Sequence, residues 1–333
     1  MRDSTPSKVS GISVVVPVLN EASSIRTLIE GLMNQTLLPT EIVVTDGGST
    51  DGTTNIVEQL IAAGAPAKLL REKRALPGRG RNVGVSNSRC DWIAFIDGGI
   101  TPEPNWLEKL AVTAEQEMAD VVFGSYEPVT DTFFKECAAI GYVAPPQEID
   151  GMLGRFRVIV STLINRKVFK EVGGFPEDLR SGEDLLFMRK MEAAGFRVAY
   201  APDAVVHWNL QPDLWSTFKR FTTYARSNIR AGLWREWQLA IFVRYAFLLL
   251  FAVPAVFAGW WWLMVPAGLW LGMMTARAGK SIWRNRRSYH ANPVRNTARL
   301  VMVMAILTVI DLSVAIGSIA WLVRDARRDL RTK

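Results

Sequence analysis

The sequence predicts an α/β fold, and two strand-like runs separated by a helical pattern carry that prediction. The runs are residues 12–21 and 41–51, each rich in β-branched residues and each ending in acidic and small residues. Residues 23–33 between them carry apolar side chains at helical spacing, at Ile25, Leu28, Ile29 and Leu32. This completes a β-α-β unit, and ligands of open α/β sheets bind at the carboxyl ends of the strands. The chain is therefore expected to open with a nucleotide-binding domain.

The motifs at these two strand ends, Pro17 to Glu21 and Asp46 to Asp51, resemble the donor site of family 2 glycosyltransferases with the GT-A fold. Further motifs follow in the order of that family: Arg79–Gly84, Trp92–Asp97, Gly173–Pro176, Glu183–Asp184 with Arg189, and Val205–His207. The resemblance implies a GT-A domain over residues 11–212, a Rossmann-like mixed sheet flanked by helices.

Composition indicates a membrane part after this domain. A mean hydropathy of +0.12 and 12 tryptophans among 333 residues are high for a soluble enzyme. Residues 239–333 hold thirteen basic and three acidic residues, a formal charge of +10, so residues 1–238 carry −3 of the net +7. The basic character therefore indicates membrane flanks and not nucleic-acid binding.

The segments outside the GT-A domain can be assigned by pattern. Residues 1–10 are polar and lack the apolar core of a signal peptide, which predicts a flexible terminus and a cytoplasmic catalytic domain. Residues 213–238 predict an amphipathic helix in the lipid headgroup region, or alternatively a helix packed on the catalytic domain. Beyond them we expect a transmembrane hairpin turning near Gly259, a basic cytoplasmic loop, a third hydrophobic segment and a basic tail, at residues 239–276, 277–299, 300–323 and 324–333 respectively.

Charge counting leaves the number of crossings open. A hairpin returns the basic loop to the cytoplasm, as the positive-inside rule requires, but a third crossing then exports the basic tail. Either the rule is broken or one segment does not cross fully. The expectation is a multi-pass protein of the inner, cytoplasmic membrane, with membrane lipids among its partners.

The donor-site residues follow from the resemblance. It implies that Pro17, Glu21 and Asp46 contact the base and ribose, which suits carboxylates because they accept hydrogen bonds. Arg79 and Arg81 could meet the phosphates, with a solvated basic loop as the alternative, and Asn82 is the more characteristic residue of that motif. Asp51 is expected to cap the helix that begins near Gly52.

A metal site is implied at the end of the strand Trp92–Asp97. The family has Asp-x-Asp here, and its carboxylates hold a divalent ion on the donor diphosphate, whereas this chain has Gly99 in place of the second acid. Asp97 and His207 are the predicted ligands of Mg²⁺ or Mn²⁺, together with the diphosphate. The alternative for His207 is a structural histidine.

The pair Glu183–Asp184 is the predicted catalytic centre. In the family, the aspartate of this pair is the general base of an inverting single displacement, and it stands here at a helix N-terminus, which favours the ionised form. Glu183 is expected to orient the acceptor or Arg180. The alternative is that both acids only cap the helix.

These assignments predict a hexosyltransferase that moves a sugar from a nucleotide sugar to a lipid-linked, polyprenyl-diphosphate acceptor, and succinoglycan-type exopolysaccharide transferases are its nearest resemblance. A processive synthase is less favoured because no Gln-x-x-Arg-Trp motif follows Asp184. A polyprenyl-phosphate glycosyltransferase and a noncatalytic nucleotide-sugar-binding membrane subunit remain alternatives. Cys90 and Cys137 are expected to be reduced thiols.

Overall fold

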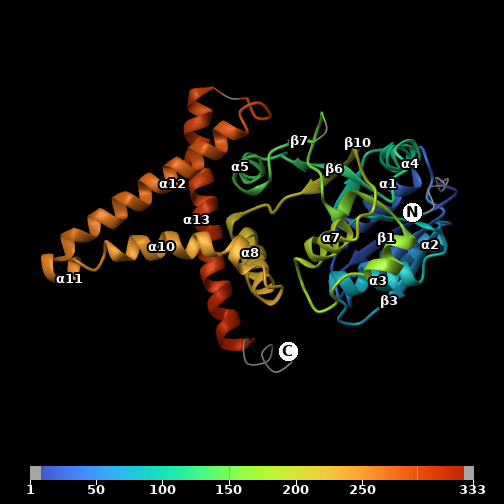
Figure 1. Ribbon diagram of the computed structural model, residues 1–333, viewed down its shortest axis with the longest axis horizontal. Helices are drawn as coiled ribbons and strands as arrows, with labels where there is room; N and C mark the ends of the chain where they lie inside the picture. Colours follow the sequence, from blue (N-terminus) through green and yellow to red (C-terminus); the bar gives the residue numbers. More distant parts are fainter. Residues whose placement is uncertain (1–8, 150, 291, 326–333) are drawn as a thin grey trace. The chain divides into compact units, whose positions relative to one another are not determined.

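A computed structural model describes residues 9–149, 151–290 and 292–325 of the chain (Figure 1). The chain divides into two compact units, one from residues 1–128 and 146–209 and the other from residues 129–145 and 210–333. The expected flexible terminus and basic tail lie almost wholly outside the described residues.

The first unit is built on a mixed sheet of eight strands in the order β3-β2-β1-β4-β9-β6-β10-β5. The strands are β1 (Ile12–Val18), β2 (Glu41–Asp46), β3 (Ala67–Arg71), β4 (Trp92–Phe95), β5 (Ile100–Pro102), β6 (Val121–Val129), β9 (Thr162–Asn165) and β10 (Val198–Asn209). The ladders β1·β2, β1·β4 and β2·β3 are parallel, whereas β9 runs antiparallel to β4 and β6, and β5 to β10. The predicted β-α-β unit is confirmed. A separate hairpin joins β7 (Gln147–Ile149) and β8 (Met152–Gly154).

Helices cover both faces of this sheet, and two apolar cores form between them and the strands. One core includes residues of α1 (Ile25–Met33), α2 (Thr53–Ala62) and α4 (Trp106–Gln116), and the other those of α3 (Pro77–Ser86), α6 (Arg166–Val172) and α7 (Glu183–Ala193). Within β1, Val14 and Val16 face the first core and Val15 faces the second. A short 3₁₀ turn, η1 (Ile159–Ser161), precedes β9.

The basic stretch Arg79–Gly84 is helical, because it lies inside α3, and its glycines allow this helix to approach β1 closely. A Cβ added at Gly84 would lie 2.4 Å from a Val15 methyl carbon, and one at Gly80 would lie 3.2 Å from Cβ of Pro17. Pro77 opens the helix, where its missing N–H costs nothing. The close packing places Arg81 directly beside the strand ends.

The second unit is helical. Its elements are α5 (Phe133–Tyr142), α8 (Leu214–Arg230), α9 (Trp234–Trp237), α10 (Leu239–Leu250), α11 (Ala255–Ala258), the 3₁₀ turn η2 (Trp260–Leu263), α12 (Met264–Arg284) and α13 (Pro293–Arg324). The long α13 packs against α8, α12 and α5. Figure 1 shows α10 and α12 as two arms that converge at α11.

The structure differs from the sequence-based expectation at two element boundaries in this unit. The predicted amphipathic helix 213–238 is interrupted at Gly232, which has a φ of 77° and separates α8 from α9. The expected basic loop 277–299 is mostly helix, because α12 continues to Arg284 and α13 starts at Pro293. The apolar pattern stops at Ala276, but alanine, arginine and lysine then favour helix without it. The turn expected near Gly259 is present, with φ of 97°.

Two helical stretches of the described chain are long and apolar enough to cross a membrane. They are Leu239–Ala258 and Pro293–Arg324, with mean hydropathies of 2.2 and 2.4. The share of buried residues is 6% in the first and 39% in the second, so the first leaves nearly all its apolar surface uncovered by this chain. The second arm of the expected hairpin, residues 260–276, does not meet these criteria.

Asp311, near the middle of α13, is buried against α10 and α12. Its side chain is 1% exposed and forms ion pairs with Arg277 of α12 at 2.5 Å and with Arg244 of α10 at 3.5 Å. The Tyr245 hydroxyl donates a hydrogen bond to the same carboxylate at 3.1 Å. The one acid inside the predicted third segment is therefore compensated by two arginines.

Candidate active site

The turns after β1 and β2 are tied to each other by short polar side chains. Both carboxylate oxygens of Asp46 accept hydrogen bonds from the backbone N–H groups of Gly48 and Ser49, the shortest at 3.1 Å. Asn20, with φ of 59°, accepts a hydrogen bond from the N–H of Thr50 at 2.9 Å. The predicted donor residues of both strands thus meet at one edge of the sheet, and Asp46 also fixes the second turn.

Glu21 lies beside the position where the family's second metal carboxylate is missing. Its carboxylate accepts a hydrogen bond from the Ser24 hydroxyl at 2.7 Å. A Cβ built at Gly99 would be 3.4 Å from Oε2 of Glu21, and one at Gly98 would be 2.8 Å from its Cγ. The two glycines therefore make room for Glu21, a relation that the sequence analysis did not foresee.

Asp51 lies one residue before the N-cap position of α2 that was predicted for it. Gly52 takes the N-cap place of α2, and Asp51 accepts hydrogen bonds from the N–H of Thr53 at 3.0 Å and from its hydroxyl. It also accepts the N–H of Ala22 at 3.0 Å, so it joins the two turns as well as the helix end. The bonds to Thr53, followed by the bond to Ala22, hold the pKa of Asp51 below its ordinary value.

Arg81 joins two predicted site residues that are distant in the sequence. Its guanidinium donates to Oε1 of Glu183 at 2.7 Å and to Oδ1 of Asp97 at 2.8 Å. The side chains of Arg81 and Glu183 are 3% and 5% exposed, whereas that of Asp97 is 38% exposed. The guanidinium also lies 5.3 Å from the centroid of the Phe175 ring. The donor end of the sheet and the start of α7 are therefore connected by one buried cation.

Burial and the charge of the partner shift the pKa values of Arg81 and Glu183 in opposite directions. Burial alone would lower the pKa of Arg81, but the charges of Asp97, Glu183 and Asp184 raise it above the ordinary value, so the guanidinium stays charged. Burial raises the pKa of Glu183 against the effect of Arg81, and the neighbouring Asp184 adds to the rise. Oε2 of Glu183 is buried without a hydrogen-bond partner among the described residues.

Arg79 and Asn82, also on α3, contact the loop before α7. Arg79 forms ion pairs with Glu72 at 2.6 Å and Glu177 at 3.0 Å and is 45% exposed. The side chain of Asn82 donates to the carbonyl of Phe175 and accepts its N–H, each at 2.9 Å. Asn82 therefore ties two of the motifs, Arg79–Gly84 and Gly173–Pro176, to each other.

Asp184 follows Glu183 at the start of α7 and is less deeply buried. Its carboxylate accepts a hydrogen bond from the N–H of Leu185 at 2.8 Å, and Gly182 caps the helix with φ of 85°. The two acids have different surroundings: Glu183 is buried and paired with Arg81, while Asp184 is only partly buried.

The predicted metal ligands are engaged by other side chains. Asp97 bonds Arg81, and Nε2 of His207 lies 2.5 Å from Oε1 of Glu103, a partner that the sequence analysis missed. Across the described residues, no three His, Cys, Asp or Glu side chains are grouped so that they could hold a metal ion. Asp97, partly exposed and bonded through one oxygen, fits a single oxygen ligand of a hard cation. His207 stays a predicted ligand.

Part of this chain is similar in sequence to a known family. Residues 13–173 match the model of glycosyl transferase family 2. Glycosyltransferase AglE of Haloferax volcanii is 28% identical over 211 residues, which cover 58% of this chain and 65% of AglE. Succinoglycan biosynthesis protein ExoA of Rhizobium meliloti is 27% identical over 316 residues, 88% of this chain and 91% of ExoA. The chain thus spans nearly all of ExoA but just under two thirds of AglE.

The fold has a solved counterpart. The structure of S. aureus TarS residues 1–349 in complex with UDP-GlcNAc superposes with a TM-score of 0.50 at 20% identity, covering 94% of this chain and 91% of that one. At this identity the likeness shows the fold alone, and it confirms the expected GT-A class.

Proposed function

We propose that this chain, whose residues 13–173 match the model of glycosyl transferase family 2, is a glycosyltransferase of that family. It transfers one sugar, with inversion, from a nucleotide sugar to a lipid-linked saccharide at the cytoplasmic face of the membrane. The observation that carries the proposal is the buried Arg81, which bonds Asp97 at the donor edge and Glu183 beside the catalytic candidate. The UDP-GlcNAc bound to TarS supports a nucleotide-sugar donor.

In this mechanism Asp184 accepts the proton of the acceptor hydroxyl. The oxygen then attacks the anomeric carbon from the face opposite the diphosphate, the glycosidic bond to the nucleotide breaks, and the configuration inverts. A positioned base contributes typically about 10²–10⁴-fold. Arg81 keeps Glu183 paired, so that the carboxylate beside Asp184 is held away from the acceptor.

Glycosyltransferases of this fold generally use a divalent cation, and Asp97 would hold it here. The cation would neutralise charge on the leaving diphosphate. Glu21, beside Gly99, is the nearest other carboxylate to the position of the missing acid.

The lipid-linked acceptor and the membrane location are supported by the helical unit and by one relative. Two stretches of the described chain are long and apolar enough to cross, and ExoA, whose name assigns it to succinoglycan biosynthesis, matches this chain over most of both lengths. Single addition is favoured over processive synthesis by the absent Gln-x-x-Arg-Trp motif.

The test is a donor panel followed by one substitution. Membranes containing the protein are supplied with UDP-, GDP- and dTDP-sugars and a polyprenyl-diphosphate saccharide. With the active donor, Asp184→Asn is expected to lower single-turnover transfer by about 10²-fold or more while nucleotide affinity stays nearly unchanged. Glu192→Gln, a substitution at an acid on the same helix, is the control.

Two results would contradict the proposal. Transfer by Asp184→Asn within tenfold of the wild type would remove Asp184 as the base. Binding of nucleotide sugars without turnover of any donor would instead indicate the noncatalytic subunit.

A further inference from the structure

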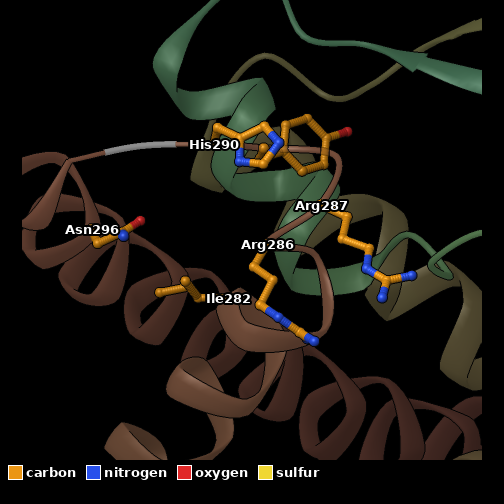
Figure 2. Close-up of a pocket in the computed structure, with 6 residues that line it drawn as sticks. Ile282, Arg286, Arg287, His290 and Asn296 are labelled. Atoms are coloured by element: carbon orange, nitrogen blue, oxygen red, sulfur yellow. The ribbon is translucent and has the colours of Figure 1, made fainter.

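A basic pocket lies in the helical unit, and none of its lining residues is among those proposed for catalysis. It has a volume of about 360 Å³ and is formed by the end of α12, the following loop and the first turns of α13 (Figure 2). Its lining residues are Ile282, Arg286, Arg287, Tyr289, His290 and Asn296. Figure 2 shows Arg286 and His290 extending from the loop, with Asn296 on the neighbouring helix.

The charge around this pocket is one-sided. Residues 277–299 contain seven basic residues and no acidic one. Some of these charges are compensated, since Arg277 pairs with Asp311, and Arg295 and Arg299 pair with Glu136 of α5. In the described part of the chain, neither Arg286 nor Arg287 has an acidic group within ion-pair distance. Two guanidinium groups at one small cavity are therefore left without a counter-charge.

The loop that carries these arginines is held in place. The N–H groups of Ser288 and Tyr289 donate to the carbonyl of Asn285, whose own side chain is buried and bonds Ser281. From α13, Arg299 donates to the carbonyl of Tyr289 at 2.9 Å. Arg286 donates to the carbonyl of Trp283 at 2.9 Å, and its guanidinium lies 4.2 Å from the centroid of that ring. The positive pocket is thus formed before any ligand binds, which lowers the entropic cost of binding.

Two exposed apolar residues stand before and after the loop in the sequence. Trp283 and Val294 are 62% and 79% exposed. Both flank the loop, and the apolar part of α13 follows a few residues later. Tryptophan beside arginine is typical of the headgroup level of a bilayer. The N-terminus of α13, capped by Asn292, adds the positive end of a 32-residue helix.

We propose that this pocket binds the phosphate or diphosphate group of a membrane lipid. Arg286 and Arg287 donate to the phosphate oxygens, because a guanidinium matches a tetrahedral oxyanion with several N–H groups. The neutral polar groups of Asn296 and Tyr289 contact the remainder of the headgroup, and the lipid chain leaves along the exposed ring of Trp283, which stacks on Arg286. The inference rests on the proposed membrane location and not on the assignment of Asp184.

The experiment measures binding of soluble lipids to the full-length protein in neutral detergent. The probes are farnesyl diphosphate, dihexanoyl phosphatidylglycerol and, as a zwitterionic reference, dihexanoyl phosphatidylcholine. The double variant Arg286→Gln/Arg287→Gln is expected to bind at least one of the two anionic probes about tenfold more weakly than the wild type. The matched control is Lys280→Gln/Arg284→Gln, which removes the same charge from the end of α12 outside the pocket, and it is expected to bind nearly as the wild type does.

The probes separate the two sources of the phosphate. Pocket-dependent binding of farnesyl diphosphate alone indicates the diphosphate of a lipid-linked substrate, and pocket-dependent binding of the glycerophospholipid alone indicates a bilayer lipid. Two results would overturn the proposal. Equal losses of probe affinity in the two double variants would mean that the basic residues attract anionic lipids without a specific site, and no loss in either would mean that they do not bind them. Nucleotide-sugar hydrolysis by the same samples reports the catalytic domain separately, and recovery of the wild type from the membrane fraction of cells reports the membrane location.

Discussion

Arg81 is the residue on which the two halves of the candidate site depend. Its partners lie 16 and 102 residues further along the chain, at the end of a strand and at the start of a helix. We expect Arg81→Gln to lower the free energy of unfolding by about 3–5 kcal/mol, because it leaves the carboxylate of Glu183 buried without its cation. Urea unfolding followed by circular dichroism measures this change.

The matched control is Arg79→Gln, two residues earlier on the same helix. Arg79 also pairs with two carboxylates, but all three side chains are substantially exposed, so little stability should be lost. Similar losses in the two variants would show that Arg81 is not the buried connection described above.

The sequence indicated which residues are candidates for the site, but it did not indicate how they contact each other. Asp97, Glu183 and Asp184 could be named from motif order, since each motif is local. The burial of Arg81 could not, because an arginine in a glycine-rich stretch looks solvated until the sheet and α7 enclose it. The Glu103 partner of His207 was missed for the same reason: the two are joined only by the β5·β10 ladder.

At the level of elements, α13 lies close against α8 at Gly317. A Cβ added there would lie 2.6 Å from the carbonyl oxygen of Thr222 and 2.8 Å from Cβ of Ala225. Gly317→Ala is therefore expected to destabilise the helical unit by about 1–3 kcal/mol through overpacking. Thermal unfolding of the detergent-solubilised protein measures it.

Gly268 on α12 is the comparison, since no atom lies within 4 Å of an added Cβ. Gly268→Ala should be neutral or stabilising by up to about 1 kcal/mol, the difference in helix propensity. If both glycine substitutions raise or lower the melting temperature alike, the crossing of α8 and α13 is not as close as described.

A second contact between elements, Glu136 of α5 with Arg295 and Arg299 of α13, makes stability depend on pH. Burial would raise the pKa of Glu136, but the hydrogen bonds and charges of the two arginines outweigh it and hold the pKa below 4.5. A lowered pKa in the folded state adds stability above pH 4.5 that is lost as the pH falls through the folded value. Glu136→Gln should therefore lower the melting temperature at pH 7, and the difference from wild type should shrink below pH 4.5.

Glu117→Gln, at an exposed acid with no ion pair among the described residues, serves as the reference for that titration. Its melting temperature should follow the wild type at every pH. A constant deficit of Glu136→Gln from pH 7 to pH 4 would mean that the lost contact is one of packing and not of charge.

At the scale of the whole molecule, the sequence predicted where glycine and proline interrupt the helices of the apolar region, but not how far each helix continues. The turn at Gly259 was predicted, because glycine and proline interrupt the apolar run there. The continuation of α12 to Arg284 was not, since that stretch has helix-favouring residues but no apolar periodicity. At 1.5 Å per residue, Leu239–Ala258 measures about 30 Å, the thickness of the hydrocarbon core, whereas α13 at about 48 Å exceeds it.

If α10 and α12 cross the membrane as the expected hairpin, the positive-inside rule predicts that both ends of this hairpin face the cytoplasm. In a background with Cys90→Ser and Cys137→Ala, cysteines at Arg235 and Arg286 should resist an impermeant maleimide in intact cells and react after permeabilisation. Efficient labelling of the Arg286 cysteine in intact cells would reverse this topology.

The carboxylate of Asp311 makes the membrane insertion of α10, α12 and α13 depend on one another. If α10, α12 and α13 all enter the bilayer, as the proposed location requires, then α10 and α12 would each expose an arginine to lipid and α13 an aspartate when inserted one at a time, and each is costly to keep there. The aspartate meets its two arginines only after all three have come together, and one positive charge remains in excess. Early release of the first two helices into the bilayer should therefore be disfavoured until α13 has been synthesised, and a chain interrupted before α13 should be recognised by membrane proteases as unfinished.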